Sequence, residues 1–128
     1  MGESQPRVFR AADQPAPPGP PTPGMDRREI VNRDETWIGW VETAPGFAGG
    51  WHHHGERESY IYVVRGELRM EYGSGGAEAI VGRAGDVIVN PAHIVHREVT
   101  PSDSVQALVV RIGPGPLNVN VDGPDAGA

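Results

Sequence analysis

Cysteine and lysine are both absent from this chain of 128 residues, and each absence excludes a class of chemistry. Without cysteine there can be no disulfide framework, thiolate metal site or cysteine nucleophile, so any metal ion must be held by nitrogen and oxygen ligands. The eleven basic residues are all arginine, and without lysine no side chain can form a Schiff base with a carbonyl substrate.

Long apolar runs are also missing. No segment approaches the length that crosses a membrane, and the first ten residues, MGESQPRVFR, lack the apolar core of a signal peptide. The net charge of −6 disfavours binding to nucleic acid or to an anionic membrane, since both would repel an acidic protein. We therefore expect a soluble cytoplasmic protein that acts on a small molecule, without a nucleic-acid or membrane partner.

The abundant residues are glycine and proline, with 18 and 13 copies, and no window keeps a helical period. Short apolar segments bounded by turn residues predict an all-β fold, either an antiparallel sandwich or a closed barrel. The expected strands are 30–31, 36–43, 59–64, 67–72, 78–81, 87–89, 94–98 and 105–112. We divide the chain into a proline-rich leader that is extended or disordered (1–24), one β-barrel domain (25–113) and a Gly/Pro-rich tail (114–128), in which Leu117, Val119 and Val121 alternate as one further strand.

All five histidines fall into two clusters, His52, His53 and His54 in the first and His93 and His96 in the second. On an extended segment His52 and His54 point to the same side, while His53 points away. Their imidazoles can share one metal ion, and His96, on an expected strand, is the natural third ligand. Three imidazoles on one side of an ion leave positions open for water or substrate, which is typical of a catalytic site.

The spacing around these clusters resembles two motifs of the cupin family. The first is Gly, five residues, His-x-His, three or four residues, Glu, six residues, Gly; the second is Gly, five residues, Pro-x-Gly, two residues, His, three residues, Asn. The matching positions are Gly46, His52, His54, Ser59 and Gly66, followed by Gly85, Pro91, His93, His96 and Thr100. The resemblance covers residues 46–100 and implies a small double-stranded β-helix, or jelly-roll, barrel with a metal ion on His52, His54 and His96.

Three positions depart from the family pattern. Ser59 stands where the motif has a glutamate ligand, so we expect its hydroxyl near the metal, and we hold the preceding Glu58 as a fourth ligand or as the catalytic acid or base. His93 replaces a turn glycine, either as an exposed turn residue or as part of the pocket. Thr100 replaces the terminal asparagine as a turn substitution. Glu98 shares a strand face with His96, where it can orient a ligand imidazole.

The site predicts a metal-dependent enzyme. A three-histidine site suits Fe(II), Mn(II), Ni(II) or Zn(II). Resemblance to cupins with such sites favours a dioxygenase-type reaction on a small organic molecule. The alternatives are a lyase, isomerase or dehydratase with a redox-inert ion, and a non-catalytic cupin that binds a metal or small ligand. Exposed edge strands and the aromatic segment TWIGW favour a homodimer.

Overall fold

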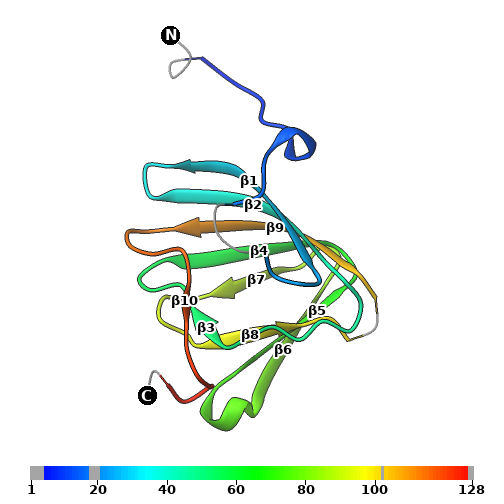
Figure 1. The fold of residues 1–128 in the computed structure, drawn as a ribbon, viewed down its shortest axis with the longest axis vertical. Helices are drawn as coiled ribbons and strands as arrows, with labels where there is room; N and C mark the ends of the chain where they lie inside the picture. The colour runs from blue at the N-terminus through cyan, green and yellow to red at the C-terminus, as the bar shows by residue number, and fades with distance from the viewer. Residues whose placement is uncertain (1–4, 18–20, 102, 127–128) are drawn as a thin grey trace.

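The computed structural model of the protein describes residues 5–17, 21–101 and 103–126, and it consists of two antiparallel sheets of five strands each (Figure 1). The first sheet contains, in spatial order, β1 (Met25–Arg33), β2 (Thr36–Thr43), β9 (Val105–Ile112), β4 (Glu58–Arg65) and β7 (Val87–Asn90). The second contains β10 (Val119–Asn120), β3 (His52–His53), β8 (His96–Val99), β5 (Glu67–Tyr72) and β6 (Glu78–Arg83). Two single 3-10 turns, η2 (Ala11–Asp13) and η3 (Ser74–Gly76), complete the elements. The all-β prediction is confirmed.

Strand bounds follow the sequence pattern closely, and β2, β5 and β9 have the expected ends. The first strand is longer than expected, because residues from Met25 onward pair with β2 along its whole length. The strand expected at 94–98 begins only at His96. His93 just before it has a φ of 65°, a left-handed turn conformation that interrupts an extended chain.

The two inner faces meet in one apolar core, as the alternating burial along each strand requires. Its buried members are Trp37, Ile61, Val63, Leu68, Met70, Ile88, Val105, Ala107 and Val109. Gly39 is needed beside it, because a Cβ atom there would lie 2.1 Å from the Trp37 ring. Trp37 keeps its indole N–H satisfied by donating to Glu29 at 2.7 Å.

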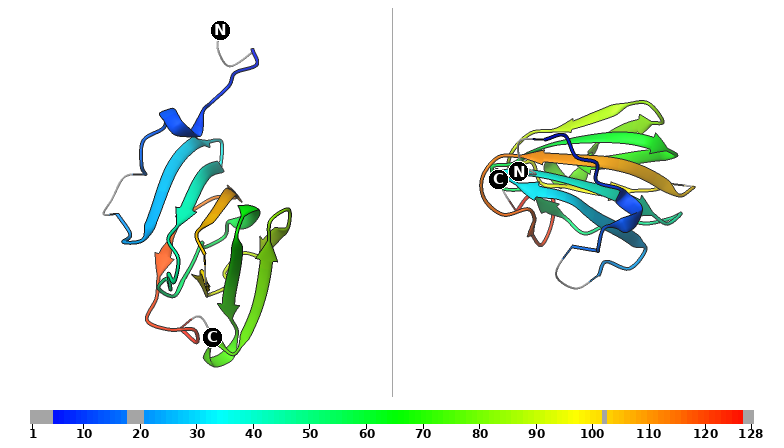
Figure 2. Two further views of the ribbon diagram at one scale, coloured as in Figure 1. Left: turned by 90° about the vertical axis from the view of Figure 1, so that its right-hand side faces the viewer. Right: turned by 90° about the horizontal axis from the view of Figure 1, so that it is seen from above.

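Both end segments contact the sheets where they are described. In the leader, the Pro15 carbonyl accepts a hydrogen bond from the Glu29 amide, which ties the chain after η2 to β1. In the tail, the further strand expected around Val119 forms as β10 and pairs with β3, so the red C-terminal segment runs along the second sheet (Figures 1 and 2). Residues 1–4 and 18–20 of the leader and 127–128 of the tail lie outside the described residues. No helix in the described part of the chain is long and apolar enough to cross a membrane.

Thr100 is more than a turn substitution. Its side chain is fully buried, donates to the Ala44 carbonyl at 2.6 Å and accepts from the Phe47 amide at 2.9 Å. Two backbone bonds add to these, from the Gly46 amide to the Thr100 carbonyl and from the Thr100 amide to the Phe47 carbonyl. Thr100 therefore fastens the loop that leads from β2 into the histidine segment, and it helps to set where that segment enters the barrel.

Candidate metal centre

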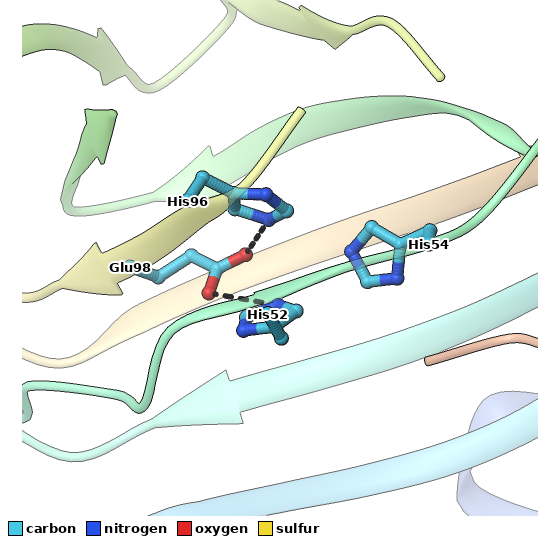
Figure 3. A group of neighbouring side chains, drawn as sticks. All are labelled: His52, His54, His96 and Glu98. Atoms are coloured by element: carbon cyan, nitrogen blue, oxygen red, sulfur yellow. Dashed lines mark hydrogen bonds and ion pairs between the residues drawn. The ribbon is translucent and has the colours of Figure 1, made fainter. Parts of the chain in front are cut away.

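Four side chains from two neighbouring strands converge inside the barrel: His52, His54, His96 and Glu98 (Figure 3). His52 and His96 are direct partners across β3 and β8, and His54 follows β3 by one residue. One nitrogen or oxygen atom of each of the four lies within 4.8 Å of all the others. The imidazole centroids of the three histidines are 4.4 to 5.1 Å apart. The structure thus brings together the three histidines that the sequence predicts as ligands.

Backbone carbonyls fix the tautomer of all three rings. His52 Nδ1 lies 2.8 Å from the Gly50 carbonyl oxygen, His54 Nδ1 lies 2.7 Å from that of Leu117, and His96 Nδ1 lies 2.9 Å from that of Ile94. A carbonyl can only accept, so each Nδ1 must carry the proton. On His52 and His54 the Nε2 is then left with its lone pair, which is the arrangement of metal-binding histidines whose second nitrogen is held by an acceptor. His96 Nε2 donates to a Glu98 carboxylate oxygen at 3.1 Å, so it must give up that proton before it can bind a metal ion.

Glu98 belongs to the cluster itself. Its two carboxylate oxygens lie 3.1 Å from His96 Nε2 and 3.6 Å from His52 Nε2, on the nitrogens that face the centre (Figure 3). The sequence predicts Glu98 as a residue that orients a ligand ring, which would place it against Nδ1. The observed contacts put its carboxylate on the Nε2 side of the two rings, where it is a candidate fourth donor beside the three imidazoles. The sequence does indicate that Glu98 lies near the cluster, because it is two residues from His96 on β8 and side chains two apart on a strand share a face.

The donor set fits a single transition-metal ion. Nitrogen and oxygen ligands at about 2.1 Å from an ion lie about 3 to 4 Å from one another. The contacts of Glu98 with His96 and His52 already have this separation, and the ligand atoms of all four residues lie within 4.8 Å of one another. His54 and His96 are buried and the Glu98 side chain is 14% exposed, so little water reaches these donor atoms. Three imidazoles and one carboxylate suit Fe(II), Mn(II), Ni(II) or Zn(II).

Charges inside the site are strongly coupled. Burial, with the nearby Arg111 guanidinium, lowers the pKa of His54 to about 2. Burial also lowers the pKa of His52, although Glu98 opposes it. Burial would raise the pKa of Glu98, but its hydrogen bond to His96 and the charges of the histidines hold that pKa at about 2. The pKa of His96 is raised, because Glu98 outweighs the effect of burial. Without metal, His96 and Glu98 therefore form an ion pair.

Acid should destabilise the metal-free protein well before ordinary carboxylates titrate. Below pH 6.5 the unfolded chain takes up a proton on His54 that the folded protein refuses, so stability falls as pH falls. His96 does not change the unfolding free energy in this range. Its pKa is raised in the folded protein, so the stability that it contributes is already fully present below pH 6.5. We expect His54 alone to remove about 1 kcal/mol of unfolding free energy between pH 6 and pH 5. Denaturant unfolding of chelator-treated protein measures this, with His53→Gln as the control and His54→Gln as the variant that reduces the slope; part of the slope remains, because the pKa of His52 is lowered too. A wild-type stability that does not change between these pH values would contradict the prediction.

Ser59 and Glu58 lie on opposite faces of β4. Ser59 is buried on the inner face, and its Oγ has no hydrogen-bond partner among the described residues. Glu58 points to the outer face, where its carboxylate accepts a hydrogen bond from the Tyr60 hydroxyl. The only irregularity in the pairing of β4 with β9 falls between Val63 and Arg65, too far along to rotate Glu58 inward. The structure therefore does not bring Glu58 into the cluster.

The remaining two histidines face each other away from the centre. His53 Nδ1 accepts from the Gly55 amide at 3.0 Å, and its ring lies 6.4 Å from that of His93. His93 is exposed and, with Tyr72 and Pro124, lines a surface hollow of about 310 Å³ that contains none of the four clustered residues. The turn interpretation of His93 fits this position, and His53 points away from the candidate ligands as alternation predicts.

Two inner-face residues near the cluster were missed by the sequence analysis. The Asn90 amide nitrogen lies 3.3 Å from His96 Nδ1. Arg111, on β9, lowers the pKa of all three clustered histidines through its charge. Both lie directly opposite Ser59 on neighbouring strands. Strand alternation puts Arg111 on the same inner face as Val109 and Ala107, so the sequence pattern could have predicted that Arg111 faces the interior.

Comparison with known proteins agrees with this arrangement. The profile of the Cupin domain matches residues 39–113, which is more than half of the chain. The polyketide cyclase RemF from Streptomyces resistomycificus is 21% identical, with a TM-score of 0.75 over 96% of this chain and 90% of that one. A protein with a double-stranded β-helix domain from Klebsiella pneumoniae is 15% identical, with a TM-score of 0.72 over 92% and 99%.

An oxalate oxidase solved with the substrate analogue glycolate is 25% identical, with a TM-score of 0.65 over 78% of this chain and 57% of that one. No curated protein sequence matches the chain significantly. The matched profile spans both histidine motifs and eight of the ten strands in whole or in part. The chain belongs to the cupin family and has its double-stranded β-helix fold.

Proposed function

We propose that this cupin is a metal-dependent enzyme acting on a small organic molecule, with His52, His54, His96 and Glu98 as the metal ligands. The observation that carries the proposal is the shared orientation of the three histidines, each with Nδ1 bonded to a backbone carbonyl and Nε2 directed at the centre. A purely structural histidine cluster has no need of three Nε2 atoms directed at one point. Four protein donors leave an ion with up to six ligands free to take one or two further groups.

The chain's own residues define what the site does to a bound molecule. Glu98 and the imidazoles hold the reacting end of the substrate in a buried interior, where electrostatic interactions are strong. A metal ion bound there would polarise a carbonyl or hydroxyl oxygen and, with iron, would support reaction with dioxygen.

Between the possible reactions we favour a dioxygenase-type reaction, and a redox-inert lyase, isomerase or dehydratase is the alternative. The solved relatives support both classes, since one is an oxalate oxidase and another a polyketide cyclase. Glu58, expected from the sequence as the acid or base, has no place in this proposal because its carboxylate lies on the outer face of β4. A homodimer and a cytoplasmic location stay predictions; the exposed Tyr62, Val87 and Val89 give a second copy an apolar patch to cover.

Oxygen consumption distinguishes the two classes. Metal-free protein is loaded in parallel with Fe(II) and Zn(II) and offered a panel of small hydroxy acids, diones and enols under air. We expect uptake of dioxygen by the Fe(II) protein with at least one compound and none by the Zn(II) protein. Product formation with Zn(II) and without oxygen uptake would favour the lyase or isomerase class instead. Stoichiometric metal with no turnover of either kind would leave the non-catalytic binding role.

A further inference from the structure

Arg111 is a half-buried charged residue with no ion-pair partner among the described residues. Its side chain enters the barrel from β9 and lies over the Trp37 ring, with the guanidinium carbon 4.8 Å from the ring centroid. Its Nε is buried and has no hydrogen-bond partner, and no carboxylate oxygen of the described residues comes within the 4.0 Å of an ion pair. A buried donor left unpaired costs about 1 to 3 kcal/mol, and more when it carries a charge. Such a cost suggests a partner that arrives from solution.

Ser59, on the neighbouring strand β4, is a second buried polar group without a partner. It is the direct cross-strand partner of Arg111, on the same inner face, and its buried Oγ is also without a partner. Cross-strand partners on one face have Cβ atoms about 5 Å apart. Two unpaired polar groups, a hydroxyl and a guanidinium, therefore lie side by side. Asn90, the other partner of Ser59, contacts His96, so this pair of groups adjoins the metal centre.

The local charge favours an anion although the whole protein is acidic. Burial, together with the charges of the nearby Arg27 and Arg57 guanidinium groups, lowers the pKa of Arg111 to about 10, which leaves the group charged at neutral pH. Glu98 is the one acid whose charge acts on Arg111 in the opposite sense. A metal ion bound to Glu98 neutralises that carboxylate, so the loaded site has positive charge that no described residue compensates.

We infer that Arg111 and Ser59 bind the carboxylate of an organic-acid substrate whose other end lies at the metal centre. The inference rests on the proposed function. A guanidinium matches a carboxylate with two parallel N–H donors, and the serine hydroxyl donates a third hydrogen bond. The substrate class is a small acid with an oxygen next to the carboxylate, such as a 2-hydroxy or 2-oxo acid. Stacking on Trp37 holds the guanidinium flat and ready, which lowers the entropy lost on binding.

Calorimetric binding of two acids and their neutral amides tests the inference without turnover. Lactate and pyruvate are each compared with the corresponding amide on Zn(II)-loaded protein. We expect the wild type to bind at least one acid at least tenfold more tightly than its amide. Arg111→Met should lose this preference while it keeps its metal content, and Ser59→Ala should weaken acid binding about fivefold. Arg83→Met, which removes an exposed guanidinium on β6, is the matched control and should change neither quantity.

Each alternative outcome is decisive. Acid binding that survives both Arg111→Met and Ser59→Ala, or a wild type that does not distinguish the acids from the amides, overturns the inference and leaves the metal centre intact. If Arg111→Met does not fold, Ser59→Ala alone decides, because a serine-to-alanine change removes only the hydroxyl. If the wild type takes up no metal, the proposed function fails, and the same titration of metal-free protein decides whether Arg111 binds the acids by itself.

Discussion

Replacing His54 by alanine should remove the metal ion from the protein, while replacing the neighbouring His53 should leave it in place. His54 is 4% exposed, and its Nδ1 is fixed by the Leu117 carbonyl so that Nε2 faces the cluster. His53 points to the other side of β3, toward His93. Loss of residues that only orient a ligand already costs 10- to 100-fold in metal affinity, so loss of a ligand should cost more than about 100-fold.

Elemental analysis of tag-free protein after metal loading and gel filtration measures the outcome. We expect about one ion per chain in the wild type and in His53→Ala, and less than about a tenth of an ion in His54→Ala. Thermal unfolding of metal-free samples controls for folding, since both variants should unfold at temperatures close to that of the wild type. Equal loss in both variants would mean that the run of histidines binds metal as a flexible surface tract, and the internal site would be wrong.

The fold and three of the four candidate ligands could be predicted because inward-facing and outward-facing residues alternate along each strand, and this alternation can be seen in the sequence. Glu67–Tyr72 alternates so regularly that both ends of β5 follow, and His52-x-His54 shares a face for the same reason. Motif spacing added the one long-range contact, between His52 and His96, that alternation cannot supply. Strand ends were predicted wrongly where a single backbone angle sets them. At His93 a positive φ interrupts the extended chain, so β8 begins at His96 and not at residue 94.

The rest of the site depends on which strands become neighbours, and a sequence pattern does not contain that information. Arg111 is far along the chain from every histidine, and it reaches the cluster only because β9 lies between β2 and β4. The Leu117 carbonyl, which fixes His54, comes from a tail that looks like a loose Gly/Pro segment. The family motif has its carboxylate ligand at the position of Ser59 on β4, whereas the carboxylate that lies among the three histidines is that of Glu98 on β8.

Glu98 should prove to be the carboxylate ligand, and its removal is the second large effect we expect. Glu98→Ala should weaken metal binding about 100-fold, because it removes the donor that contacts both His52 and His96. Glu58→Ala is the matched control: it deletes a carboxylate whose partner is Tyr60 on the outer face, and metal binding should stay unchanged. Competition with a chromophoric chelator gives the two affinities under identical conditions.

Moving the carboxylate back to the motif position distinguishes a ligand from a residue that only balances charge. Ser59 lies on the inner face of β4 with an unpaired Oγ, so a glutamate there can extend toward the centre. We expect Ser59→Glu in the Glu98→Ala background to recover about tenfold of the lost affinity; recovery stays partial because Arg111, beside position 59, attracts the new carboxylate. If the Glu58→Ala variant loses metal and Glu98→Ala keeps it, the ligand lies on β4 after all, and the contacts of Glu98 serve only to hold a protonated His96. Such a result would mean that β4 must twist by one residue on metal binding, a change that amide exchange across the β4–β9 pairing would reveal.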